Sequence, residues 1–449
     1  MSILYAPLIS FLIGALIFLA VMPPPYSGNL FLNVFFAIGV GLGISAQITF
    51  YSFLLVHKFD PPVILSANFI VLVLLLIINR QSLRIAVPAL IKNKHFSLPG
   101  VGVGLVFVAI GGLTYYTASG QPFGQWDAWA LWNMKTKFLI FGGTRWTDIF
   151  KLHWHTQPDY PLLLPFINTW IFAVLQKYFN FVPALTSLIF TLACAGLLYA
   201  GLARYIPTKI AFISALTFVT LPVYPLWGTY QYADIVLTYY LLAGVIFMTM
   251  TLREKNSAFA VLLGIILGLM SFTKNEGIIM AGLLSILTIV YLVMKKTIEP
   301  PLKIKILAGF FVGLLLTTPP TLILKWTLAP VNRDMGLGLA QTQHPFLNWQ
   351  GLDFILKKFG SVVFDPRFML IGLPLTIMFL LQPRLYFKKE LKPLTLFFIF
   401  YFLCLCLVYL TTIHFDLQWR LSRTATRAFM IQLPAMLFLN LYAYWHKDD

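Results

Sequence analysis

The residues best suited to chemistry lie in a stretch that combines one carboxylate with several aromatic rings. In residues 125–143, Asp127 stands between Trp126 and Trp129, and further apolar and aromatic residues recur at helical spacing. Indole rings can stack on the apolar face of a sugar ring, so the group suits sugar recognition. The same pattern is also typical of an interfacial helix with its aromatic face toward the membrane and a capping Asp at its start. Both interpretations predict a helix from about residue 127.

A second carboxylate follows in a turn framed by prolines. Asp159 and Tyr160 lie between Pro158 and Pro161, where the next apolar segment begins. Asp159 could join Asp127 on the same side of the membrane, or it could simply form the turn after proline. Both roles remain open from the sequence.

Further ionisable residues border apolar segments. Asp234 opens one segment, with Tyr232 two residues before it, and Lys274 and Glu276 lie between two others. Ionisable groups are expensive at such positions, so they are candidates for a functional site. Lys274 could instead extend to the interface or pair with Glu276.

Three arginines precede the last apolar segment. Arg420, Arg423 and Arg427 are spaced i, i+3 and i+7, which places them on one face of a helix. Guanidinium groups match the geometry of phosphate. A carboxylate on an aromatic helix, an intramembrane lysine and an arginine face together fit the transfer of a group from a lipid phosphate.

The composition shows which elements must position these residues. The 449 residues are 59% hydrophobic and only 10% charged, and the mean hydropathy is +0.84. A soluble globular chain carries roughly 25% charged residues, so we expect an all-α, polytopic membrane protein. A span needs about 20 apolar residues, and roughly thirteen spans leave no room for a large extramembrane domain. The net charge of +17 is then expected to orient the helices in the membrane or to bind phosphate. Nucleic acid is not an expected partner.

About 12 to 14 spans are expected. The apolar runs between Pro, Gly and charged residues predict spans near 3–22, 31–56, 62–79, 100–117, 182–203, 210–227, 235–252, 258–272, 277–294, 306–326, 368–382, 394–412 and 428–445. We divide the chain into additional N-terminal membrane helices (1–117), an external catalytic loop with amphipathic helices (118–160) and the remaining helical core (161–449), all in one integrated domain.

Short basic loops, such as 204–209, 253–255 and 295–305, are expected in the cytoplasm. This orientation places Asp127, Asp234, Lys274 and Arg427 outside, together with basic residues that topology does not require. One inconsistency follows, because the apolar segment 161–175 makes the number of crossings between residues 160 and 204 even. Either that segment lies in the interface or re-enters, or a basic loop is misassigned.

In their order, these features resemble the GT-C superfamily of glycosyltransferases that use polyprenyl-phosphate sugars, especially the protein O-mannosyltransferase, aminoarabinose transferase and lipopolysaccharide galacturonosyltransferase branch. The resemblance covers about 118–434. The matching elements are Trp126-Asp127-Ala128-Trp129 with Lys135 and Lys137, Gln157-Pro158-Asp159-Tyr160-Pro161-Leu162, Ala233-Asp234-Ile-Val-Leu237, Thr273-Lys274-Asn-Glu-Gly277, and Arg427 followed by Pro434. Two departures are the helices preceding the acidic loop and Asp127-Ala128 where many relatives have Asp-Glu.

The resemblance implies that a sugar moves from a polyprenyl phosphate to an acceptor hydroxyl, with inversion, at the extracytoplasmic face of the inner (plasma) membrane. Asp127 would be the general base. Arg427, Arg423 and Lys274 would bind the donor phosphate. The sugar or the acceptor, which is a glycan, lipid or protein, would contact the remaining candidates, Trp126, Trp129, Asp159, Tyr160, Tyr232, Asp234 and Glu276.

A different function class is the main alternative. A multi-span transporter or flippase of lipid-linked saccharides would also need many spans and intramembrane charges, although no internal repeat typical of transporters occurs in the sequence. No cofactor is assigned, and metal dependence stays open because no carboxylate-rich ligand set stands out. The sugar, the acceptor and the prenyl length do not follow from the sequence.

Overall fold

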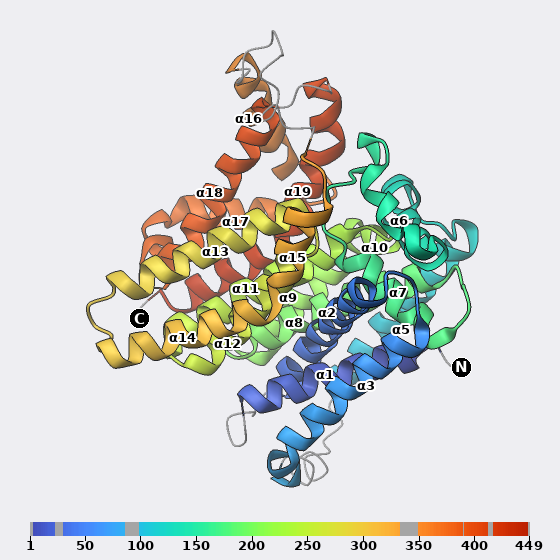
Figure 1. Cartoon of the computed structure of the whole chain (residues 1–449). Helices are drawn as coiled ribbons and strands as arrows, with labels where there is room; N and C mark the ends of the chain where they lie inside the picture. Colours follow the sequence, from blue (N-terminus) through green and yellow to red (C-terminus); the bar gives the residue numbers. More distant parts are fainter. Residues whose placement is uncertain are drawn as a thin grey trace.

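The computed structural model describes residues 3–22, 30–85, 98–332, 349–388, 390–411 and 416–447. Within these ranges the chain folds into helices joined by loops, and no strand occurs. The long apolar helices form one bundle, and α6, α16 and the beginning of α19 lie above its centre in Figure 1. The predicted all-α, polytopic class is confirmed.

The helices of the first half of the chain are α1 (Tyr5–Val21), α2 (Leu30–Val56), α3 (Pro61–Ile78), α5 (Leu98–Gly120), η1 (Ala128–Trp132), α6 (Asn133–Phe141), η2 (Gly143–Lys151), η3 (Trp154–Thr156), α7 (Leu163–Leu175), α8 (Val182–Leu202), α9 (Thr208–Thr220) and α10 (Val223–Thr229). Those of the second half are α11 (Ala233–Glu254), α12 (Ser257–Ser271), α13 (Asn275–Met294), α14 (Pro300–Thr317), α15 (Pro319–Ile323), η4 (Leu324–Leu328), η6 (Trp349–Gly351), α16 (Leu352–Val363), α17 (Met369–Leu381), η7 (Pro383–Phe387), α18 (Leu391–Leu410) and α19 (Leu417–Trp445).

Eight of these helices are long and apolar enough to cross a membrane, namely α2, α3, α8, α11, α13, α14, α18 and α19. The pair α9 and α10, bent by 59° at a short break, would be a ninth. The other predicted spans coincide with the shorter apolar helices α1, α5, α12 and α17. Every predicted range therefore meets a helix, but fewer helices in the described part reach the length of a span than the 12 to 14 expected.

Helix α7 explains the inconsistency in the number of crossings. Its 13 residues rise about 20 Å at 1.5 Å per residue, which is less than the roughly 30 Å of a hydrocarbon core. At its start the Leu163 amide donates to the Phe272 carbonyl, next to Lys274. Just beyond its end, the Tyr178 ring lies 5.7 Å from the ring of Phe141, the last residue of α6. Both ends of α7 thus lie near the loops that carry the candidate residues, and we expect that α7 does not cross the membrane.

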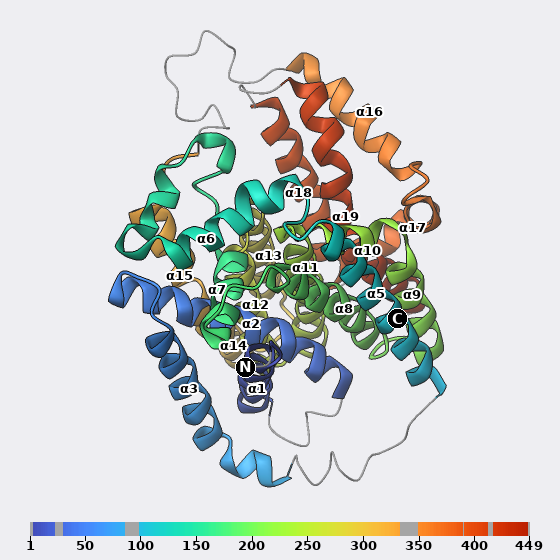
Figure 2. The same ribbon diagram turned by 90° about the vertical axis from the view of Figure 1, so that its right-hand side faces the viewer.

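Two helices approach closely because glycines face each other. A Cβ on Gly264 of α12 would lie 2.3 Å from the Phe310 carbonyl oxygen of α14, and a Cβ on Gly313 would lie 2.1 Å from the Val261 oxygen. Small residues four apart let membrane helices pack backbone to backbone. This contact fixes α14 and, through it, the short helices α15 and η4 that end beside the candidate site. In Figure 1 α14 runs along the side of the bundle next to α12, and α15 continues from its end; Figure 2 gives the view turned by 90°.

The aromatic stretch after α5 forms a helix at the predicted place. It begins as one π-helical turn, η1, and continues as α6. The Gln125 amide donates to the Tyr230 carbonyl at 3.3 Å, and the Asn133 amide group donates to Gln231 Oε1 at 2.9 Å, so the stretch is bound to the loop before α11. Asp127 lies at the N-cap position, but its side chain makes no capping hydrogen bond. Asp127 thus has the expected position at the helix start, but its side chain does not cap the helix.

Candidate functional site

The centre of the candidate site is one arginine between two carboxylates. Arg427 lies in the first half of α19, and its Nη1 is 2.6 Å from Asp127 Oδ2. Its Nη2 is 2.7 Å from Asp234 Oδ2, at the first turn of α11. The side chain of Asp234 is 1% exposed, whereas that of Asp127 is 20% exposed. Asp127 is thus the carboxylate of the pair that an incoming molecule can reach.

Lys274 extends this ion-pair network. Its Nζ lies 3.2 Å from Asp234 Oδ1 and 3.0 Å from Glu276 Oε1. Burial disfavours the charged lysine, but Asp234 and Glu276 outweigh burial and raise the pKa of Lys274. The second oxygen of Glu276, Oε2, is buried and has no hydrogen-bond partner. The network therefore offers one unused acceptor beside its lysine.

Aromatic rings cover Arg427. Its guanidinium carbon lies 4.9 Å from the centre of the Tyr232 ring and 5.6 Å from that of Trp227, within the range of cation–π attraction. The Asp127 amide donates to the Tyr232 hydroxyl at 3.4 Å. Burial and the nearby charge of Asp127 raise the pKa of Tyr232, so this residue stays a neutral phenol.

A second polar cluster surrounds Asp159. Asn275 and Asn332 donate to its Oδ2 at 2.6 and 3.0 Å. Lys325, in η4, donates to the Asp159 carbonyl and to Asn275 Oδ1, both at 2.6 Å, and lies 3.3 Å from Asp159 Oδ2. Burial lowers the pKa of Lys325, and Asp159 opposes this effect. Asp159 is therefore held by partners from three parts of the chain and is more than a turn-forming residue.

Lys135 and Tyr160 connect the two clusters. Lys135, on α6, is fully buried and donates to the Gln157 carbonyl at 2.5 Å. The nitrogens of Lys135 and Lys274 lie 5.8 and 6.0 Å from the centre of the Tyr160 ring. Burial lowers the pKa of Lys135 to about 7, with Asp159 raising it and Lys325 lowering it further. The loop that carries Asp159 and Tyr160 is thus fixed by a lysine on each side.

Three predicted residues lie at the exposed side of the site. Trp126 and Trp129 are 66% and 47% exposed, and their rings meet edge to face with centres 4.5 Å apart. Arg423 is exposed one turn before Arg427, and the structure shows no ion pair for it within the described ranges. Arg427 is the member of the arginine face that the structure, in its described part, pairs with Asp127 and Asp234.

The structure brings most of the predicted residues together. Asp127, Asp234, Lys274, Glu276 and Arg427 form one network of ion pairs. Their neighbours Tyr232, Asp159 and Tyr160 border it through the contacts described above.

The sequence analysis assigned no role to several residues of the site, among them Lys325 and Asn275. Lys325 lies near the end of a predicted span, and a lone lysine at such a place is itself a signal for function. Asn275 is next to Lys274, but no pattern distinguishes it. Among the described residues, no three His, Cys, Asp or Glu side chains are grouped so that they could hold a metal ion.

The comparison with known proteins adds one finding. Residues 159–323 match the model of the dolichyl-phosphate-mannose-protein mannosyltransferase family. No curated protein and no solved structure matches the chain. The matched segment is less than half of the chain and runs from Asp159 to the end of α15, so it contains Asp234, Lys274 and Glu276 but neither Asp127 nor Arg427. Residues 159–323 are thus similar to a family of GT-C-type membrane glycosyltransferases, and this match confirms the resemblance found in the sequence.

Proposed function

We propose that the protein moves a sugar from a polyprenyl phosphate to an acceptor hydroxyl, with inversion at the anomeric carbon, on the extracytoplasmic side of the plasma membrane. Asp127 is the general base. The observation that carries the proposal is the position of Arg427, 2.6 Å from Asp127 and 2.7 Å from the buried Asp234. A base and a cation suited to phosphate are thereby held next to each other.

The reaction needs a base because an alcohol is a poor nucleophile. Asp127 accepts the hydroxyl proton as the acceptor oxygen forms its bond to the anomeric carbon. The bond from that carbon to the phosphate oxygen breaks on the opposite face, and its electron pair stays on the phosphate. The products are the glycosylated acceptor and the polyprenyl phosphate, and Asp127 then releases its proton to water.

The leaving phosphate needs fixed positive charge more than it needs an acid. Arg427 uses two of its five N–H groups on Asp127 and Asp234, which leaves three for phosphate oxygens. Lys274 lies on the same network and adds a second cation. Arg423 is exposed one turn away and can meet the phosphate as it enters from the bilayer.

The sugar and acceptor contacts are assigned to the residues around this network. Tyr232 and Tyr160 offer rings and hydroxyl groups, and Asp159, Asp234 and Glu276 offer acceptor oxygens. Trp126 and Trp129 lie where an acceptor approaches from water. The bound acceptor is a glycan, a lipid or a protein.

The test is product analysis with the purified protein in nanodiscs. Candidate polyprenyl-phosphate sugars and membrane glycolipids are added, and the products are identified by mass spectrometry. Asp127→Asn should lower the transfer rate by about 10²- to 10⁴-fold, the usual contribution of a general base, while binding of polyprenyl phosphate is retained. Arg427→Ala should weaken that binding. Asp148→Asn, in a surface ion pair with Lys151 in the same loop, is the matched control.

Full transfer by Asp127→Asn would remove Asp127 as the base. The alternative class, a transporter of lipid-linked saccharides, is examined in the same nanodisc lipids reconstituted as vesicles. Movement of the donor lipid between leaflets without any glycosylated product would replace the transferase proposal.

A further inference from the structure

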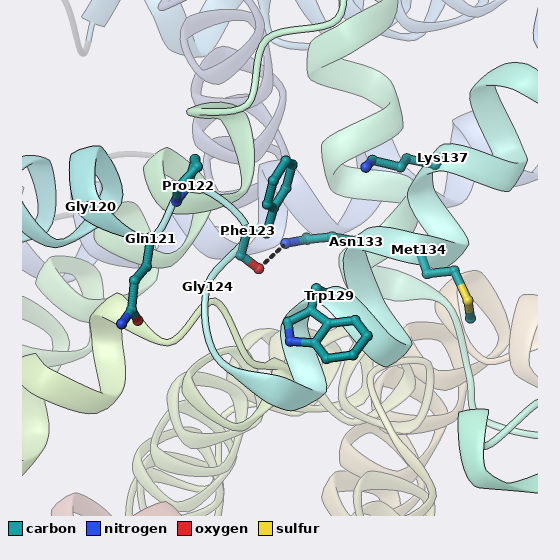
Figure 3. A pocket seen from close by; sticks show the side chains of 9 residues that line it. All are labelled: Gly120, Gln121, Pro122, Phe123, Gly124, Trp129, Asn133, Met134 and Lys137. Atoms are coloured by element: carbon teal, nitrogen blue, oxygen red, sulfur yellow. Dashed lines mark hydrogen bonds between the residues drawn. The ribbon is translucent and has the colours of Figure 1, made fainter.

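A pocket of about 580 Å³ lies on the side of the amphipathic helix that faces away from the ion pairs. Its wall is formed by the loop Gly120–Gly124 after α5 and by side chains of η1 and α6, as Figure 3 shows. The volume is within the range of roughly 300 to 1,000 Å³ that small-molecule sites occupy. None of the residues assigned above to catalysis or phosphate binding lines it.

The periodicity of the helix separates this pocket from the base. Asp127, Leu131 and Lys135 follow one another at four-residue intervals and point to the buried network. Trp129, Asn133 and Lys137 are also four residues apart, and all three line the pocket. They are offset by two positions from the first set, which is about half a helical turn. One helix therefore presents the base on one face and the pocket on the other.

The polar group at the pocket is an amide whose oxygen is unused. The Asn133 nitrogen donates to the Phe123 carbonyl at 3.1 Å, drawn as the dashed line in Figure 3, and to Gln231 Oε1 at 2.9 Å. Both partners are acceptors, which fixes the orientation of the amide. Asn133 Oδ1 is buried without a hydrogen-bond partner, which is unfavourable for a polar atom. A hydroxyl of a bound molecule would satisfy it.

The remaining wall is aromatic with one cation. Trp129 and Phe123 are 47% and 42% exposed. Lys137 is exposed, and its nitrogen lies 4.7 Å from the centre of the Phe123 ring and 5.7 Å from that of Tyr178. The ammonium is thus held at the edge of the pocket, where it favours a negatively charged substituent. An aromatic wall, a hydroxyl acceptor and a cation together match an acidic sugar.

We propose that this pocket binds a sugar ring of the acceptor that carries an acidic group, with the ring against Trp129, a hydroxyl on Asn133 Oδ1 and the acidic group at Lys137. This inference rests on the proposed function, because it names the acceptor class as an anionic saccharide. The second face of the helix then holds the acceptor chain while Asp127 acts on its hydroxyl.

The test measures sugar binding without any donor or transfer. Saturation-transfer NMR is recorded on the protein in nanodiscs with methyl β-D-glucoside and methyl β-D-glucuronide. The wild type should bind both and bind the glucuronide more tightly. Trp129→Ala should lower binding of both at least fivefold, and Lys137→Gln should remove only the preference for the glucuronide. Phe141→Ala is the matched control, since Phe141 is a 67% exposed ring on the same helix that does not line the pocket.

Binding by Trp129→Ala equal to wild type would overturn the proposal, and so would a glucuronide preference that survives Lys137→Gln. A single-chain lipid is also added as a competitor. If it displaces the sugars and binds the wild type and Trp129→Ala equally well, the pocket is a lipid site instead. The outcome is independent of the transfer assay. A protein that binds the sugars as expected but forms no product contradicts the proposed function alone.

Discussion

At the scale of single residues, the site is a set of charges that almost all have partners inside the protein. Arg427 is matched by Asp127 and Asp234, and Lys274 by Asp234 and Glu276. Breaking a buried ion pair by removing one partner is strongly destabilising, because the other charge stays buried alone. The site residues therefore position one another as well as any substrate.

Lys135 differs from these residues because, in the part of the chain that the structure describes, its nitrogen is in no ion pair and donates a hydrogen bond to the Gln157 carbonyl. Its pKa of about 7 in the folded protein is below the value of roughly 10.4 in an unfolded chain. Between these values the unfolded state binds more protons, so the free energy of unfolding rises with pH. The charged lysine thus destabilises the fold fully below pH 7, and this cost falls as the pH rises above 7.

Lys135→Met should remove this dependence, since methionine does not titrate. Between pH 7 and pH 9, the free energy of unfolding of the wild type should rise relative to that of Lys135→Met. The slope of this rise should approach about 1.4 kcal/mol per pH unit. Thermal unfolding at pH 6, 7, 8 and 9 measures it. Lys177→Met, at an exposed lysine, is the control. A difference that stays constant with pH would contradict the assignment.

At the scale of elements, the sequence located the helices better than it described their ends. Apolar runs predicted every long helix, because the bilayer imposes length and apolarity on each span. The range 306–326 was predicted as one span, but the helix begins at Pro300 and ends at Thr317, where Pro319 and Pro320 start α15. Proline favours the first turn of a helix, so these two prolines mark the start of a new helix inside the predicted range.

The sequence predicted the site residues whose charge stands out beside an apolar run. It did not predict the partners that only the packing of the helices brings to the site. An Asp or Lys next to an apolar run is conspicuous, so Asp234 and Lys274 were identified. The partners of Asp159 come from α13 and from residues after α14, and no spacing in the sequence links them to residue 159. That link depends on the contact between α12 and α14.

This contact gives a prediction at the same scale. Gly264→Leu should lower the thermal midpoint and reduce the yield of monodisperse protein, because a side chain at Gly264 meets the backbone of Phe310 and Leu314. Overpacking costs about 1 to 3 kcal/mol, and the displaced α14 would also move Lys325 away from Asp159. Gly282→Leu is the control, since a Cβ there meets nothing within 4 Å. An unchanged midpoint for Gly264→Leu would show that the helices are not in backbone contact.

At the scale of the whole molecule, the candidate residues gather at one end of the bundle because the helices around them alternate in direction. Asp234 begins α11, Lys274 lies between α12 and α13, and Lys325 follows α14. If α7 is not a membrane-crossing helix, residues 144 and 177 should lie on the same side of the membrane. The single crossing by α8 should then place Arg204 on the opposite side. The turn between α13 and α14 should share the side of Arg204.

Cysteine labelling in intact cells tests this arrangement. In a background with Cys194, Cys404 and Cys406 replaced, Thr144→Cys and Lys177→Cys should both react with a membrane-impermeant maleimide, because both positions are exposed in loops of the site side. Thr297→Cys, exposed between α13 and α14, should react only after permeabilisation. If Lys177→Cys instead required permeabilisation, α7 would cross the membrane and α8 would return. Arg204 would then share the side of Asp127, and the basic loops could no longer be cytoplasmic while the site is external.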